Sequence, residues 1–208
     1  MYINNELATE ITIPSSVTSI GTQLRGCTSI KSVIIPDSVT SIGNSAFSGC
    51  TALATVSLPE SILTIDKYAF RGCEALTYVS LPDSVKTLGE YVFYNCKNLA
   101  DICLPEGKLS AIPGNAFNAC SKLTNIYIPD NITSFGDSAF LGCNNLSDIY
   151  YNGTETEWNA ISIVSSNSTI WAADVHFAHS HETLEWKVLY EAQPHSNGMK
   201  SSICEICL

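Results

Sequence analysis

Residues 53–76 read LATVSLPESILTIDKYAFRGCEAL, and variants of this stretch recur along most of the chain. Prolines and Ala-Phe or Val-Phe pairs recur in phase with six cysteines, which are separated by 23, 23, 23, 24 and 23 residues: Cys27, Cys50, Cys73, Cys96, Cys120 and Cys143. A fixed period in the twenties is typical of stacked coils, because a single coil is too small to bury its own apolar face. The sequence therefore predicts an elongated array over residues 1–151, with about six to seven coils of about 23 residues.

Each repeat predicts a short strand followed by a turn. Apolar and polar side chains alternate in residues 56–58, which is typical of a strand with one buried face. Pro59 has no N–H to donate to a sheet and ends the strand, and Ile62 and Ile65 should point inward from the next arm of the coil. Residues 69–73 fit one helical or 3₁₀ turn on the outer side. Stacking then aligns equivalent strands in a parallel sheet, with about 4.8 Å between coils.

A phenylalanine occupies the same position in five repeats: Phe47, Phe70, Phe93, Phe117 and Phe140. These rings should form a continuous stack, because equivalent side chains of neighbouring coils lie directly over one another. The first repeat has Leu24 instead and is one residue shorter, as expected for an atypical terminal coil. The fifth repeat carries one extra residue around Gly107 and Lys108, where we expect a small bulge.

The residue before each cysteine is usually glycine. This suggests either a backbone with positive φ or a requirement for a small side chain. Asn95 tolerates positive φ, but Ala119 does not adopt it comfortably. We favour the requirement for a small side chain.

Three interpretations compete for the cysteine series: disulfide bonds, a metal site or a column of buried thiols. Equivalent residues of stacked coils lie about 4.8 Å apart, whereas a disulfide needs Cβ atoms about 3.5 to 4.5 Å apart. A linear column also cannot place four thiolates around one zinc ion. We favour the buried column, in which each cysteine is a small apolar residue and a weak S–H donor. Cys103 lies outside the series, and its outward position makes it the best candidate for an accessible thiol.

Residues 152–178 are predicted to cap the array. Thr154 and Glu157 form a capping-box pattern, so a short helix should begin there and place Trp158 and Ile161 against the last coil. Residues 170–171 and 175–177 are expected to return as a final strand. Such a cap would protect the exposed edge of the sheet.

Residues 179–208 form a separate tail that resembles a truncated small module. Its Cys-x-x-Cys pair, Cys204 and Cys207, could bind zinc together with His181 and His195. A disulfide bond and the absence of any site are the alternatives. We favour the absence of a site, because typical zinc sites contain a second copy of the pair.

Composition excludes several functions. The net charge is −10 with 10 Lys plus Arg, which argues against nucleic acids and anionic membranes as partners. No stretch of about 18 apolar residues is present for membrane insertion. The four histidines all lie in the last 33 positions, and the sequence has no nucleophile elbow, phosphate-binding loop or zinc-protease motif. We therefore expect neither an enzyme nor a bound cofactor.

The repeated pattern Ile-Pro-x-Ser-Val-x-x-Ile-Gly-x-x-Ala-Phe-x-Gly-Cys-x-x-Leu closely resembles the BspA-like class of leucine-rich repeats, which are surface and secreted proteins chiefly of host-associated bacteria and some protozoan parasites. The resemblance covers residues 7 to about 151. It implies an α/β-type, right-handed leucine-rich-repeat solenoid with a parallel sheet, short strands, and helical or 3₁₀ turns. It also implies a non-catalytic adhesion or binding module that is extracellular or at the cell surface. Free cysteines are more usual in reducing compartments, but buried thiols can persist outside the cell.

Outward positions of the later strands are the candidate binding site for a protein or glycan partner. Tyrosine offers a large, fairly rigid contact with a polar tip, and it is enriched at interaction hot spots. The candidate residues are Tyr78, Asp101, Asn125, Tyr127, Asp148 and Tyr150. The alternatives are a structural spacer in a larger surface protein and a metal-binding tail module. We expect a monomer.

Overall fold

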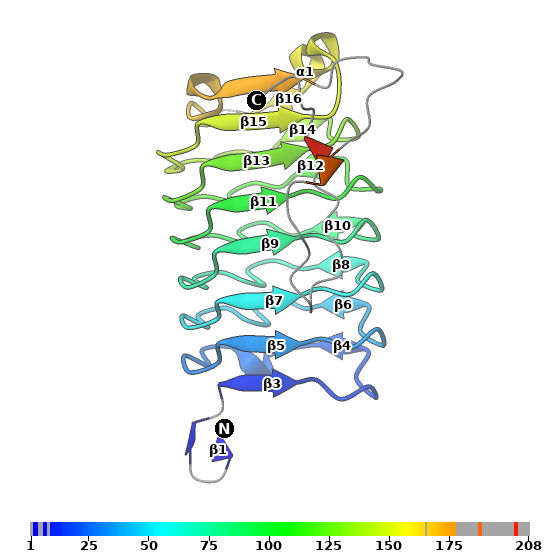
Figure 1. Ribbon diagram of the computed structural model, residues 1–208, viewed down its shortest axis with the longest axis vertical. Helices are drawn as coiled ribbons and strands as arrows, with labels where there is room; N and C mark the ends of the chain where they lie inside the picture. Colours follow the sequence, from blue (N-terminus) through cyan, green and yellow to red (C-terminus); the bar gives the residue numbers. More distant parts are fainter. Residues whose placement is uncertain are drawn as a thin grey trace.

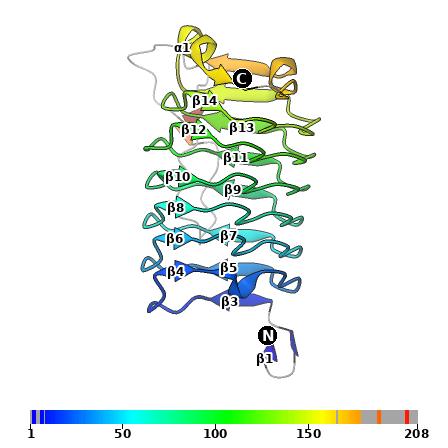
Figure 2. The same cartoon turned by 180° about the vertical axis from the view of Figure 1, so that it is seen from behind.

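The computed structural model describes residues 9–164 and 166–177, together with four two-residue strands outside this part. These strands form two antiparallel pairs, β1 (Tyr2–Ile3) with β2 (Glu6–Leu7) and β18 (Lys187–Val188) with β19 (Ser202–Ile203). The rest is a nearly straight stack of coils, a parallel-sheet solenoid of about seven turns with few helices (Figure 1 and Figure 2). The predicted fold class is confirmed.

The first strand of each coil forms one side of the stack, which we call the sheet face. Its middle residue points into the core, as the alternation predicted, and Val79 and Ile102 are at most 1% exposed. Pairing is parallel and in register along two ladders, β3 to β7 and β9 to β17. The strands are β3 (Glu10–Thr12), β5 (Ser32–Ile34), β7 (Thr55–Ser57), β9 (Tyr78–Ser80), β11 (Asp101–Cys103), β13 (Asn125–Ile128), β15 (Asp148–Tyr151) and β17 (Asp174–Phe177).

A second column of short strands follows the proline turn of each coil. In three coils a serine follows the Pro-Asp or Pro-Glu pair and connects two coils, because its hydroxyl donates to a carbonyl of the preceding coil; the Ser61 Oγ lies 2.6 Å from the carbonyl oxygen of Val39. The inward residues Ile62 and Ile65 are fully buried, as predicted. The strands are β4 (Ser19–Ile20), β6 (Ser41–Ile42), β8 (Thr64–Ile65), β10 (Thr87–Leu88), β12 (Ala111–Ile112), β14 (Ser134–Phe135) and β16 (Ser162–Ile163).

The extra residue of the fifth repeat interrupts this second column. Residues 106–108 form a bend, and β10 and β12 belong to different sheets. The bend packs against Asp83, whose carboxylate accepts the Glu106 N–H at 2.9 Å, and a Cβ on Gly107 would lie 1.9 Å from the Asp83 carbonyl oxygen. The insertion therefore breaks the pairing, whereas we had predicted a bulge within it.

The third side, which we call the turn face, differs from the predicted helical or 3₁₀ turn. Among the described coils, the first has a 3₁₀ segment here, η1 (Thr22–Leu24), and the later ones have successive turns. Alternate N–H groups bond within the coil and to the next coil. Arg71 N–H donates to the Tyr68 carbonyl at 3.1 Å, whereas Phe70 N–H donates to the Val92 carbonyl of the next coil at 2.9 Å. Hydrogen bonds thus join the coils on all three sides.

In the second to sixth coils, two residues of this turn have positive φ, four positions apart. In the third coil they are Tyr68 at 59° and Gly72 at 70°. The position before the cysteine needs this conformation, because Ala119 also adopts it, with φ of 63°. Our preference for a small side chain alone was therefore wrong. Space is restricted there as well, since a Cβ on Gly142 would lie 3.3 Å from the Ala119 Cα.

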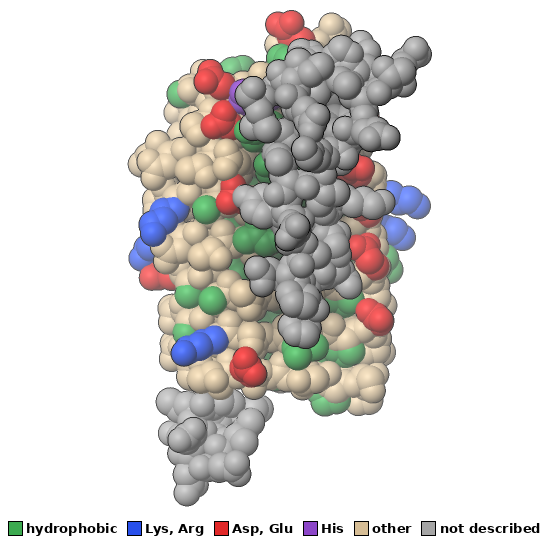
Figure 3. Space-filling view, in the orientation of Figure 1, with side chains coloured by type: hydrophobic (Ala, Val, Ile, Leu, Met, Phe, Trp, Pro, Cys, Tyr) green, Lys and Arg blue, Asp and Glu red, His purple; other side chains and the backbone are tan. Residues whose placement is uncertain are grey.

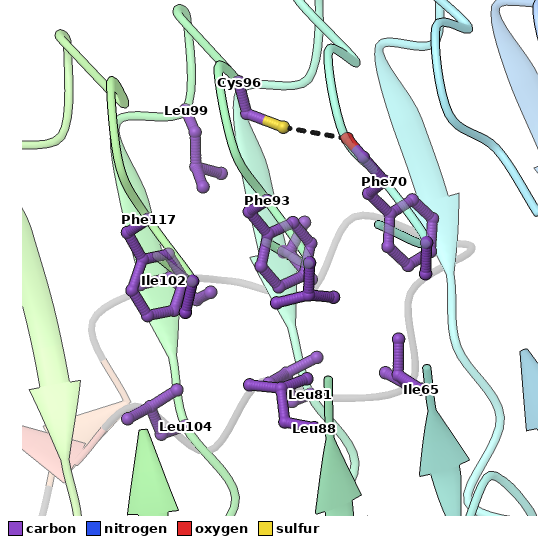
Figure 4. Close-up of a cluster of buried hydrophobic side chains, with 14 of the residues drawn as sticks. Ile65, Phe70, Leu81, Leu88, Phe93, Cys96, Leu99, Ile102, Leu104 and Phe117 are labelled. Carbon is purple, nitrogen blue, oxygen red and sulfur yellow. Dashed lines mark hydrogen bonds between the residues drawn. The ribbon is translucent and has the colours of Figure 1, made fainter. Parts of the chain in front are cut away.

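The phenylalanine stack fills the core behind the turn face, as predicted. Successive ring centroids along Phe47, Phe70, Phe93, Phe117 and Phe140 are 5.1, 5.4, 5.7 and 5.3 Å apart, and none of the five side chains is exposed. Figure 4 shows three of these rings among buried leucine and isoleucine side chains, which include Ile65 of β8, Leu88 of β10 and Ile102 of β11. The core continues without interruption from Ile20 to Ile170.

The cap begins with helix α1 (Glu155–Ala160), and its capping box of Thr154 and Glu157 is present as predicted. Trp158 is buried, and its ring packs edge-on against Phe135 and Tyr151. The prediction of a strand at residues 170–171 was wrong, because these residues lie in a 3₁₀ segment, η2 (Ile170–Ala172). Residues 175–177 do return to the sheet, in β17.

Candidate functional site

The six predicted binding residues lie on the C-terminal part of the sheet face, and we call them the sheet strip. The strand register separates them into two rows. Tyr78, Asp101, Asn125 and Asp148 pair directly across β9 to β15. Tyr127 and Tyr150 lie two residues further along their strands, in a row with Cys103. All six side chains are half-buried, and in the visible part of this face the Lys and Arg side chains lie toward its two flanks (Figure 3).

The aromatic row contains a three-ring stack. The centroids of Tyr127 and Tyr150 are 4.9 Å apart with an interplanar angle of 12°, and His176 continues the stack 4.8 Å beyond Tyr150. These rings come from β13, β15 and β17, so the spacing between strands sets the spacing between rings. The stack is held in place by a hydrogen-bonded sheet and requires little ordering upon binding.

The polar row is linked by side-chain hydrogen bonds. Asn125 donates from Nδ2 to the Asp101 carboxylate at 2.6 Å. The His176 Nε2 lies 2.8 Å from the Asp148 carboxylate. Hydrogen bonds from the Ser147 hydroxyl and from His176 lower the pKa of Asp148 below its usual value. Asp148 is therefore ionised at neutral pH, and the row presents carboxylate acceptors beside an aromatic surface.

The N-terminal end of the strip is built differently. The Tyr78 hydroxyl lies 3.9 Å from the Cys103 Sγ, at the limit of a weak hydrogen bond. Burial raises the pKa of Tyr78 above its usual value and raises the pKa of Cys103 to about 11. Cys103 is therefore a half-buried, protonated thiol at neutral pH, and its accessibility to reagents stays a prediction.

Two functional candidates, Asp174 and His176, were missed. Both lie in β17, and they pair with Asp148 and Tyr150 respectively. The signal was present in the sequence, because Asp174-Val-His-Phe matches Asp148-Ile-Tyr-Tyr in its alternation. We had predicted a strand at residues 175–177 but had ended the array at Tyr151, and the outward side chains of this strand were therefore not assigned to the binding site.

The cysteine column lies behind the turn face, away from the sheet strip. Each thiol donates to the carbonyl of a residue in the preceding coil; Cys96 Sγ lies 3.2 Å from the Phe70 oxygen (Figure 4). Equivalent contacts of 3.0 to 3.2 Å are made by Cys50, Cys73, Cys120 and Cys143. Burial raises the pKa of Cys50 to about 11 and that of Cys143 to about 12. Cys27 differs, because it lies in the first coil and is half-exposed.

No cluster of three or more potential metal ligands occurs in the part of the chain that the structure describes. The zinc candidates His181, His195, Cys204 and Cys207 lie outside these residues. Within the same part, no helix has the length and apolar character needed to cross a lipid bilayer.

Several solved structures of bacterial proteins are similar to this chain. A leucine-rich repeat protein from Bacteroides ovatus is 26% identical with a TM-score of 0.56; the match covers 81% of this chain and 55% of that protein. The leucine-rich repeat protein of T. pallidum is 28% identical with a TM-score of 0.53, over 68% of this chain and 79% of that one. The pneumococcal vaccine antigen PcpA shares the fold, with a TM-score of 0.65 at 17% identity, over 86% of this chain and 43% of that one.

A search of curated proteins found no significant match. The sequence profile of the BspA type leucine rich repeat region matches in six copies, over residues 2–107 and 43–169. These matches span the whole solenoid and most of its cap. The chain belongs to the BspA-type leucine-rich repeat family.

Proposed function

We propose that this chain is a non-catalytic binding module, secreted or held at the cell surface, that recognises a protein or glycan partner through the sheet strip. The observation that carries the proposal is the Tyr127–Tyr150–His176 stack beside the Asp148 carboxylate. Rings of this kind give apolar contact area, and the adjacent carboxylates and amides can hydrogen-bond hydroxyl or N–H groups of a partner.

The surrounding scaffold supports the same proposal. Ile126 and Ile149 anchor the strands beneath the stack, and both are at most 1% exposed. The rows above them are therefore fixed relative to one another before a partner arrives, which reduces the entropy lost in binding. An extracellular location is compatible with the cysteine column, since protonated, buried thiols react slowly with oxidants.

A structural spacer is the second candidate, and the hydrogen bonding on three sides of each coil favours it. A stack joined in this way is stiff and could hold other domains apart without a ligand of its own. The two functions differ in one respect: a spacer tolerates changes in the sheet strip, whereas a binding module does not.

The test uses the purified protein on immobilised fibronectin, fibrinogen, laminin, collagen and mucin, and on a glycan array. We expect saturable binding to at least one of these, and its loss in the double variant Tyr127→Ser/Tyr150→Ser. Ile34→Ser is the matched control, because Ile34 is a 61% exposed apolar residue on the same face but in the second coil. Equal binding by the parent and the double variant would favour the spacer.

A further inference from the structure

A second cluster of aromatic side chains lies on the turn face of the third and fourth coils. We call Tyr68, Arg71, Tyr91 and Tyr94 the tyrosine–arginine cluster. The Tyr68 and Tyr91 rings are stacked at 5.1 Å, and Tyr94 packs against Tyr91 at 5.7 Å. The Arg71 guanidinium lies 5.8 Å from the Tyr68 centroid and 5.6 Å from the Tyr94 centroid, within cation–π range. The tyrosines are half-buried and Arg71 is exposed.

The backbone beneath this cluster is strained. Tyr68 and Tyr91 have φ values of 59° and 58°, in the left-handed region. The equivalent positions of other coils carry Ser45, Asn115 and Ser138, also at positive φ. Asparagine adopts this conformation more readily than a bulky aromatic residue, for which it is a genuine outlier. Strain of this kind persists only where the surrounding structure maintains it, and it clusters at functional sites.

Charge pairing between the two coils leaves Arg71 without a carboxylate among the described residues. Its neighbours form ion pairs, Lys67 with Glu90 and Lys97 with Glu74, each at 2.8 Å. Arg71 has no such pair in this part of the chain, so its five N–H donors remain available beside the rings. The guanidinium fork matches a carboxylate in geometry and can bind it through two parallel hydrogen bonds.

From these observations we infer that the tyrosine–arginine cluster is a docking site for a protein segment that presents an Asp or Glu carboxylate next to an aromatic or apolar side chain. Tyrosine and arginine are the residue types that dominate binding energy at protein interfaces, and the two lysine–glutamate pairs provide a polar rim. The carboxylate binds the Arg71 fork, and the adjacent side chain packs on Tyr91 and Tyr94. This site is independent of the sheet strip, which lies on another side of the coils.

The test selects random short peptides displayed on phage against the full chain, with counter-selection on the double variant Tyr68→Asn/Tyr91→Asn. Asparagine is the matched replacement, because Asn115 has φ of 58° at the equivalent position. We expect enrichment of peptides that combine an acidic residue with an aromatic one. Synthetic peptides should bind the parent at least about tenfold more tightly than Arg71→Gln or the double variant. Lys86→Gln, an exposed lysine without an ion pair among the described residues, should bind like the parent.

A thermal melt of the double variant provides a second readout. If the tyrosines serve binding, their replacement by asparagine relieves strain, and the variant melts no lower than the parent. A clearly lower melting temperature would assign the tyrosines to stability and overturn the inference. Peptides that bind Arg71→Gln as tightly as the parent would also overturn it. So would polygalacturonate binding that depends on Arg71 in the absence of any peptide binding, since the partner would then be an acidic glycan.

Discussion

The turn face and the sheet face belong to the same coils, yet their sequences differ in regularity. Behind the turn face, phenylalanine and cysteine recur at fixed positions, and each buried side chain contacts its equivalent or a carbonyl in a neighbouring coil. On the sheet face, one row reads Tyr78, Asp101, Asn125, Asp148 and Asp174. Repetition is therefore needed where a side chain packs only against a copy of itself. Where side chains are half-exposed, the fold tolerates variation, and specificity can reside there.

Phe93→Ala should have the largest effect on stability. Phe93 lies between Phe70 and Phe117 in the middle of the stack, and its removal leaves a cavity that both neighbours line. We expect a loss of about 3–5 kcal/mol in the free energy of unfolding, measured by chemical denaturation. Ile34→Ser, on the sheet face, should lose far less. A loss in Phe93→Ala below about 1 kcal/mol would show that the stack does not support the fold.

Asn167→Ala should have the next largest effect, because Asn167 closes the stack where the repeats end. Its Oδ1 accepts the Phe140 N–H at 3.1 Å, a group that bonds to the next coil in the other repeats. Its Nδ2 donates to the carbonyls of Gly136 and Val164. Removing these bonds leaves buried backbone groups unpaired, and we expect a loss of about 1–3 kcal/mol.

The control for this variant is Asn152→Ala, which changes an exposed asparagine in the cap region. Both asparagines lie in Asn-x-Ser/Thr sequences, but Asn167 is only 2% exposed. If the two variants unfold at the same denaturant concentration, the hydrogen bonds of Asn167 do not hold the cap on the array.

A smaller effect is expected for the cysteine column. Cys96→Ala removes the S–H bond to the Phe70 carbonyl, which still accepts the Cys73 N–H at 3.1 Å. The expected loss is about 1 kcal/mol. Cys96→Ser should lose less, because a hydroxyl can donate to the same oxygen. A hydroxyl already makes the equivalent bond in the cap, where the Thr169 hydroxyl donates to the Phe140 carbonyl at 2.8 Å. Serine and alanine variants of equal stability would show that this bond contributes nothing.

The sequence predicted the parts of the fold that depend on the repeat itself. The alternation in residues 56–58 and the position of Phe70 determine which side chains face the core, and a fixed period carries these assignments to every coil. The outer turn was harder to predict, because the spacing of Ala69, Phe70 and Cys73 fits a helical turn as well as successive turns with positive φ. Ile170 and Trp171 were ambiguous for a similar reason, since short apolar runs fit strands and helical segments alike.

The site was predicted within the repeats and missed beyond them. Equivalent positions in successive repeats are enough to identify Tyr127 and Tyr150 as neighbours. His176 extends their stack from the cap, and it was missed because the sequence repeat ends before the cap begins. The roles of Asn167 and Thr169 could not be predicted either, because each occurs once and belongs to no repeated pattern. The Asn167 side chain takes the place of a backbone carbonyl of the next coil, and the Thr169 hydroxyl takes the place of a cysteine thiol.

The double variant Tyr127→Ser/Tyr150→Ser tests in one protein whether the sheet strip binds a partner while the repeated interior supports the fold. We measure its thermal melt and its binding to the immobilised matrix proteins and glycans described above. We expect a melting temperature close to that of the parent, because both side chains are only half-buried, together with loss of binding. Retained binding at an unchanged melting temperature would show that the sheet strip is not the binding surface.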